Sequence, residues 1–273
     1  MTIKLVAFDI DGTFLNDQNT YDHQRFGQIL NKLRARNIHV VSASGSQYQR
    51  LQDQFAEFQT EMDFVTQNGA VVYSHGQPLS IQDMPTQAVT VILKAIQQQF
   101  AATDIAEHLV VGVKSAYVDQ RISQAAYDLT YHYYNHLQRV PELVNVTPEK
   151  LQDQITSIGI TFSDHVDFDG KIKTLQQLLP PGLASQTAGF NTQLISERSV
   201  NKAHGLQQLQ EKYRIANNEI MTFGDDENDL SMLTVTPHSY AMANARPIVK
   251  QAAQHLTVSN NDDGVLKVLS SLL

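Results

Sequence analysis

The sequence contains no cysteine among its 273 residues. This absence excludes disulfide bonds, thiolate catalysis and cysteine-ligated zinc or iron–sulfur sites, and it fits a reducing compartment. A surplus of basic residues is also missing, because 20 Lys and Arg face 28 Asp and Glu, for a net charge of −8. Nucleic acids and anionic membranes attract proteins that carry such a surplus, so neither is expected as a partner.

Long hydrophobic runs are absent as well. No stretch approaches the roughly 18 apolar residues of a membrane span, and the apolar run Ile3 to Phe8 meets Asp9 too soon for the core of a signal peptide. We therefore expect a cytoplasmic protein without a membrane span. With 42% hydrophobic and 18% charged residues, the chain is typical of a globular protein with one large domain or two smaller ones. Its oligomeric state stays open.

Short apolar runs alternate with helical patterns toward both ends of the chain. The run 3–8, the helical spacing of apolar residues over 26–33 and the run 38–41 form a β-α-β unit, which implies a parallel sheet. The rhythm changes near residue 83 and returns after about residue 190, where Gln193 to Ile195 reads as a strand. We predict an α/β fold with a Rossmann-like parallel-sheet core, residues 1–82 and 190–273, and an inserted α+β domain, residues 83–189.

Polar clusters follow the predicted strands or open the predicted helices of this core. Ligands of open parallel sheets bind beyond the carboxyl ends of the strands, so these clusters are the candidate site. The four clusters are Asp9-Ile10-Asp11-Gly12-Thr13, Ser42-Ala43-Ser44-Gly45, Lys202, and Gly224-Asp225-Asp226-Glu227-Asn228-Asp229.

A site rich in carboxylates, with one lysine and small hydroxyl and glycine residues, suits Mg²⁺ together with a phosphoryl group. Mg²⁺ prefers hard oxygen ligands, and an aspartate can attack phosphorus to form an aspartyl-phosphate. Asp11 stands two residues after Asp9, on the same side if the strand stays extended, where it can protonate a leaving oxygen and later deprotonate water.

In their order along the chain, these clusters resemble the motifs of the haloacid-dehalogenase superfamily of phosphatases, and in particular its Cof-type sugar-phosphatase branch with a large cap. The resemblance covers essentially the whole chain. Weaker accessory matches are Asn68-Gly69-Ala70, Met242-Ala243-Asn244-Ala245 and Asp263-Gly264-Val265. It implies a Mg²⁺-dependent hydrolase of small phosphomonoesters, such as sugar phosphates, with the inserted domain as a cap that selects the substrate.

The resemblance also implies a role for individual residues. Asp9 would be the nucleophile and Asp11 the general acid and base, and Mg²⁺ would be held by Asp9, the Asp11 backbone carbonyl and Asp225. Asp229 would orient Lys202 or a water on the metal. The phosphate would be bound by the Ile10 amide, Ser44, the Gly45 amide, Lys202 and Asn228.

The second motif departs from the family pattern. The family often has Thr-Gly-Arg there, whereas this chain has Ser44-Gly45-Ser46. Serine can replace the threonine hydroxyl, but the arginine has no counterpart at position 46, and Arg50 is a candidate substitute. In the inserted domain, the segment from Tyr131 to His136 is explained by a half-buried helix at least as well as by a substrate contact.

Two alternative functions stay open at the level of the sequence. A phosphomutase or phosphotransferase would use the same core but needs a second phosphate pocket, and residues 83–189 contain only two arginines, Arg121 and Arg139. A signalling protein whose aspartate is phosphorylated as a switch is the other alternative. The inserted domain argues against it, because such receivers are usually a single compact domain.

Overall fold

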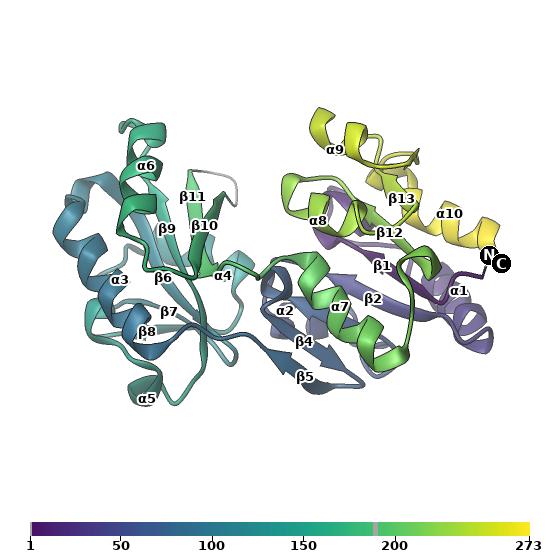
Figure 1. Ribbon diagram of the computed structural model, residues 1–273, viewed down its shortest axis with the longest axis horizontal. Coiled ribbons are helices and arrows are strands. Elements are labelled where there is room, and N and C mark those ends of the chain that lie inside the picture. The colour runs from purple at the N-terminus through teal and green to yellow at the C-terminus, as the bar shows by residue number, and fades with distance from the viewer. Residues whose placement is uncertain (1, 188–190) are drawn as a thin grey trace. The chain divides into compact units, whose positions relative to one another are not determined.

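The computed structural model describes residues 2–187 and 191–273 (Figure 1). The chain divides into two compact units, which we call the core unit, Met1–Ser80 with Asn201–Leu273, and the inserted unit, Ile81–Val200. Two chain segments far apart in the sequence therefore build one unit, drawn in purple to blue and in green to yellow in Figure 1. The predicted α/β fold class is confirmed.

The core unit contains one large sheet in the order β14-β13-β12-β1-β2-β3-β4-β5. Neighbouring strands from β14 to β3 pair in parallel, and β4 runs antiparallel to β3. The strands are β1 (Leu5–Phe8), β2 (His39–Ala43), β3 (Asp63–Thr66), β4 (Val71–Ser74), β5 (Gln77–Ile81), β12 (Ile220–Gly224), β13 (His238–Ala241) and β14 (His255–Leu256).

Both faces of this sheet are covered, as expected for strands that are apolar on both sides. On one face Leu5 and Ala7 of β1 belong to an apolar cluster with Leu206. On the other face Phe8 contacts the ring of Phe26. The helices are α1 (His23–Ala35), α2 (Tyr48–Gln54), α7 (Lys202–Tyr213), α8 (Leu230–Leu233), α9 (Pro247–Ala252) and α10 (Gly264–Leu272).

The strand order changes direction at the pair β1 and β12. From β1 the N-terminal segment continues through β2 to β5, whereas the C-terminal segment continues from β12 in the opposite direction. In open α/β sheets the crevice beyond the carboxyl ends of two such strands is the usual ligand site. Asp9 follows β1 and Asp225 follows β12, so the topology places both carboxylates at this point.

The inserted unit contains its own sheet, in the order β10-β11-β9-β6-β7-β8. An apolar cluster joins one face of the sheet, including Val110 and Ile158, to Leu93 of α3 and Leu175 of α6. Its strands and helices are β6 (Ile105–Gly112), β7 (Ala116–Asp119), β8 (Leu137–Val140), β9 (Ile155–Phe162), β10 (Leu183–Thr187), β11 (Thr192–Glu197), α3 (Thr86–Gln99), α4 (Gln124–Tyr133), α5 (Pro148–Leu151) and α6 (Phe168–Leu178).

The strand predicted at Gln193 to Ile195 forms, but the prediction that it belongs to the core is wrong. It is part of β11, which pairs antiparallel with β9 and β10. Residues 191–200 therefore belong to the inserted unit, which ends at Val200. The predicted boundary between residues 189 and 190 falls in the segment 188–190, outside the described residues.

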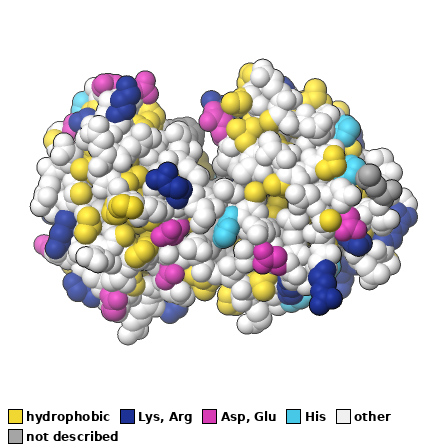
Figure 2. Space-filling model, viewed as in Figure 1, with side chains coloured by type: hydrophobic (Ala, Val, Ile, Leu, Met, Phe, Trp, Pro, Cys, Tyr) yellow, Lys and Arg dark blue, Asp and Glu magenta, His cyan; other side chains and the backbone are white. Residues whose placement is uncertain are grey.

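The surface carries both acidic and basic side chains, with no patch of one sign among the described residues on the face drawn in Figure 2. Figure 2 shows acidic and basic side chains scattered over the face that it presents. Within residues 2–187 and 191–273, no helix has both the length and the hydropathy that a membrane span requires.

The predicted hairpin at Asn68-Gly69 joins β3 and β4. Gly69 has φ +98°, and a Cβ built on it would lie 2.1 Å from the carbonyl oxygen of Asn201, the residue before α7. The turn therefore lies directly against the beginning of α7, where only glycine avoids a clash.

Gly69→Ala should lower the free energy of unfolding by about 3 kcal/mol, since backbone strain at positive φ and the clash with Asn201 act together. Gly76→Ala is a matched control, because Gly76 also has positive φ but has no atom within 4 Å of its built Cβ. The control should cost only about 1 kcal/mol. Urea unfolding followed by circular dichroism measures both, and equal losses would show that the contact with α7 is not a constraint.

Candidate active site

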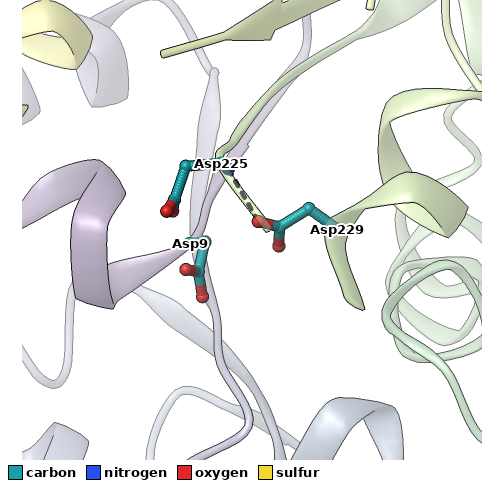
Figure 3. A group of neighbouring side chains, drawn as sticks. All are labelled: Asp9, Asp225 and Asp229. Atoms are coloured by element: carbon teal, nitrogen blue, oxygen red, sulfur yellow. Dashed lines mark hydrogen bonds between the residues drawn. The ribbon is translucent and has the colours of Figure 1, made fainter. Parts of the chain in front are cut away.

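Three carboxylates converge at the carboxyl ends of β1 and β12. Ligand atoms of Asp9, Asp225 and Asp229 all lie within 4.8 Å of one another. Figure 3 shows the three side chains together. Asp9 directly follows β1 and donates its backbone N–H to the carbonyl of Phe223 in β12. Asp9 and Asp229 are buried, and Asp225 is half-buried. Such a set of hard oxygens could hold a divalent cation.

Lys202 lies among these carboxylates. Its Nζ donates to Asp9 Oδ1 at 2.5 Å and to Asp229 Oδ1 at 2.6 Å, and its side chain has no solvent exposure. Lys202 is the first residue of α7, whose first turn is capped by the Asn201 side chain, which accepts from the backbone N–H of His204. Because Lys202 opens α7, its ammonium group lies at the carboxyl end of β1.

Asp229 is fully used by contacts within the site. One oxygen accepts from Lys202, and the other accepts the backbone N–H groups of Asp225 at 2.8 Å and Asp226 at 3.1 Å. The bond to Asp225 is the dashed line in Figure 3. Asp229 thus fixes the loop that carries Asp225 and the position of Lys202.

Asp225 is positioned by residues of the Asp9–Thr13 cluster. Thr13 Oγ1 donates to Asp225 Oδ1 at 2.6 Å, and a Cβ on Gly12 would lie 2.4 Å from Asp225 Oδ2. A side chain at position 12 would therefore displace the carboxylate. This role of Thr13 is not predicted from the sequence, where its place directly after Asp11 and Gly12 is the one signal for it.

The electrostatics of the cluster reflect crowding of negative charge in a buried place. Burial, followed by the charge of Asp229, raises the pKa of Asp9 well above its usual range, although Lys202 opposes this shift. Burial raises the pKa of Asp225 to about 7. Desolvation acts to lower the pKa of Lys202, but the charges of Asp229 and Asp9 outweigh it and hold that pKa above its ordinary value.

The Ser44–Gly45 segment lies against the turn after β3. The Ser44 carbonyl accepts the backbone N–H of Asn68 at 3.0 Å. Because the carbonyl and the following N–H of a trans peptide point in opposite directions, the Gly45 N–H points away from Asn68. The side chain of Asn68 in turn accepts from Asn228 at 3.1 Å, so the accessory Asn68 joins two of the predicted phosphate-binding segments.

Asp11 takes a different position from the one expected. The strand ends at Phe8, and residues 10–14 form a tight turn with Gly12 at φ +76°, so the strand does not stay extended as far as Asp11. The Asp11 side chain is absent from the three-carboxylate cluster and is bound by Arg50. Ile10 is buried within the same turn.

The Tyr131 to His136 segment belongs to the inserted unit. Helix α4 ends at Tyr133, and Tyr131 and Tyr133 are exposed. Burial raises the pKa of Tyr134, with the charge of Glu107 adding to the shift. A helix forms here as the sequence suggested, but it is more exposed than expected, with Thr130 the one fully buried residue of α4.

Lys202→Met should lower the free energy of unfolding by about 3 kcal/mol, because two buried carboxylates would lose the ammonium group that pairs with both. Denaturation should be followed in EDTA, so that no cation replaces the lost charge. Lys171→Met is the control, since Lys171 pairs with Asp104 at 2.7 Å in a more exposed place and should cost far less. Similar losses in both variants would mean that the buried pairs contribute no more than the surface one.

Comparison with known proteins gives consistent matches over the full chain. A family model described as haloacid dehalogenase-like hydrolase matches residues 6–269. The chain is 33% identical over 273 residues to the Escherichia coli 5-amino-6-(5-phospho-D-ribitylamino)uracil phosphatase YbjI, covering 100% of this chain and 97% of that protein. It is 26% identical to the Bacillus subtilis phosphatase YitU of the same name, covering 97% and 96%.

A solved structure has the same fold. The crystal structure of a Streptococcus mutans protein superposes with a TM-score of 0.88 at 28% identity, covering 99% of this chain and 98% of that one. The resemblance drawn from the motifs is therefore confirmed by similarity that extends over both units.

Proposed function

Because this chain belongs to the haloacid dehalogenase-like hydrolase family and is a phosphatase, we propose that it hydrolyses small phosphomonoesters through a phosphoryl group carried on Asp9. The observation that carries this proposal is the contact between Lys202 and Asp9 at the carboxyl end of β1. A buried ammonium beside a buried carboxylate is the arrangement that a nucleophile needs when its target is an anionic phosphate.

The proposed first step transfers the phosphoryl group to Asp9. An Asp9 carboxylate oxygen forms a bond to phosphorus while the bond from phosphorus to the ester oxygen breaks, and Asp11 gives its proton to that leaving oxygen. In the second step a water oxygen attacks phosphorus, Asp11 takes the proton of the water, and the bond to Asp9 breaks. Inorganic phosphate leaves, and both aspartates return to their starting states.

We further propose that the phosphoryl oxygens are bound by the Ile10 amide, Ser44 with the Gly45 amide, Lys202 and Asn228. An ammonium group has three N–H donors, and the contacts to Asp9 and Asp229 use two of them. The third is assigned to a phosphoryl oxygen. The Ser44–Gly45 segment is held by the bond from the Asn68 N–H to the Ser44 carbonyl, and the Asn68 side chain also binds Asn228, which supports a shared site for these groups.

Mg²⁺ is the proposed cofactor, held by Asp9, the Asp11 carbonyl and Asp225. The residues fit the ion, because three carboxylates against one ammonium leave two negative charges in the cluster when all are ionised. Mg²⁺ would supply charge neutralisation for the phosphoryl group and for these carboxylates. Asp9 and Asp225 then stay ionised in a place that otherwise favours their protonated forms.

For the substrate, we propose a sugar or sugar-alcohol phosphate. Two of the matched relatives are named for the phosphate ester of a ribitylaminouracil, which makes that compound the first one to test. The inserted unit is assigned the choice among leaving groups, since the residues of the proposed chemistry all belong to the core unit. The proposed location is the cytoplasm, from the absence of cysteine.

Asp9→Asn should reduce phosphate release by about 10⁴-fold or more, because an amide cannot act as the nucleophile. Release of inorganic phosphate from 5-amino-6-(5-phospho-D-ribitylamino)uracil and from p-nitrophenyl phosphate measures this loss. Asp22→Asn is the matched control, since asparagine caps α1 as well as the aspartate that caps it now. Normal turnover by Asp9→Asn would refute the proposed intermediate.

MgCl₂ should raise the thermal unfolding temperature of the wild-type protein by several degrees, since a ligand at 100 times its Kd stabilises by about 2.7 kcal/mol. Asp225→Asn should lose most of this shift. Asp226→Asn should keep it, because Asp226 is exposed and pairs with Arg246 on the surface. Activity should disappear in EDTA and return with MgCl₂. An equal thermal shift in both variants would place the ion elsewhere.

A further inference from the structure

Arg50 binds the Asp11 side chain with both of its terminal nitrogens. Nη1 donates to Asp11 Oδ2 at 2.6 Å, and Nη2 donates to Asp11 Oδ1 at 2.7 Å. This is the bidentate geometry in which a planar guanidinium fixes both the position and the plane of a carboxylate. The two residues are 39 positions apart, so the contact is created by the fold.

Arg50 is itself fixed. Its Nη1 also donates to Ser46 Oγ at 2.6 Å, and its side chain is only 13% exposed, compared with 46% for Asp11. Arg50 lies in α2, which begins at Tyr48, three residues after Gly45. The better-buried, doubly held partner therefore determines where the more exposed one lies.

The Ser46 contact also explains the departure in the second motif. Where the family pattern has an arginine, this chain has a serine whose hydroxyl accepts from an arginine four residues later. Arg50 lies in the first turn of α2, and its side chain reaches back past the N-cap residue Gln47 to Ser46.

We propose that Arg50 is a positioning residue that holds the Asp11 carboxyl group in the orientation from which it exchanges protons with the leaving oxygen and with water. This inference rests on the proposed function, in which Asp11 is the general acid and base. When one Asp11 oxygen takes up the proton, its contact with Arg50 opens, and the remaining N–H bond to the other oxygen keeps the carboxyl group oriented. Without Arg50 the half-exposed Asp11 side chain would rotate. Its carboxyl group would then have to find the orientation for proton transfer anew in each catalytic cycle.

The test uses two substrates that differ in their need for a proton donor. p-Nitrophenyl phosphate has a leaving group that departs as a stable anion, whereas D-ribitol 5-phosphate releases an alkoxide that must be protonated. Arg50→Gln should lower kcat/KM for D-ribitol 5-phosphate by about tenfold to a hundredfold, which is less than the full contribution of about 10²–10⁴ from general acid catalysis because Asp11 itself is still present. The value for p-nitrophenyl phosphate should change by no more than about twofold.

Three further variants make the result specific. Arg50→Lys should restore part of the lost activity, because an ammonium can make one of the two contacts. Arg50→Gln should have little further effect in the Asp11→Asn background, since the group that it orients has already been removed. Arg25→Gln, which removes a guanidinium that pairs with Asp263 at 3.2 Å in the same unit, should leave both substrates unaffected. Circular dichroism establishes that each variant is folded.

The outcomes separate the inference from the function on which it rests. Equal losses on the two substrates, a gain on D-ribitol 5-phosphate, or effects of Arg50→Gln and Asp11→Asn that simply add would overturn the role of Arg50 while leaving Asp11 as the acid. If Asp11→Asn itself affects both substrates equally, Asp11 is not the proton donor. The proposed function then fails in that part, and the role of Arg50 falls with it.

Discussion

The ion pairs of Lys202 with Asp9 and Asp229 are the constraint around which the core unit is arranged. Charges in a place without solvent are tolerated only when they are paired closely, and here one ammonium serves two carboxylates at 2.5 and 2.6 Å. The three residues follow β1, open α7 and follow β12. A shift of any of these elements by a fraction of a turn would leave a charge unpaired, so the pairing fixes the elements against one another.

Backbone features support the same arrangement. The Gly69 turn lies against the start of α7, and the Asn68 N–H and side chain connect this turn to Ser44 and Asn228. A short hairpin thus links the segments that we assign to phosphate binding. Placing polar groups on turns fixed by a rigid sheet gives precise geometry without a long ordered loop.

Much of this arrangement follows from the sequence, for a physical reason. Asp9 and Asp225 directly follow apolar runs, and parallel strands end at one edge of their sheet, so strand ends that are distant in the sequence come together. Lys202 is found in the same way, as the first residue of a helical pattern. Local patterns determine where these residues lie along strands and helices, and pairing of the strands brings them together in space.

Other features depend on tertiary contacts that a local pattern does not encode. The alternation at Gln193 to Ile195 suits a strand in either sheet, and only the pairing with β9 and β10 assigns it to the inserted unit. Asp11 leaves the line of the strand because Gly12 permits a sharp turn. The sequence offers Arg50 only as a candidate substitute for the missing arginine, and its contact with Asp11 depends on the direction of a side chain on α2.

The division of the core unit between two chain segments has a consequence for biosynthesis. The central strand β1 is made first, but its neighbour β12 emerges from the ribosome only after the whole inserted unit has been synthesised. Chains fold domain by domain during translation, and pairings between distant segments are slow to form because a long loop must close. The continuous inserted unit can therefore complete its sheet while β1 still presents an open edge, which exposes the nascent core to misassembly until residues 220–224 arrive.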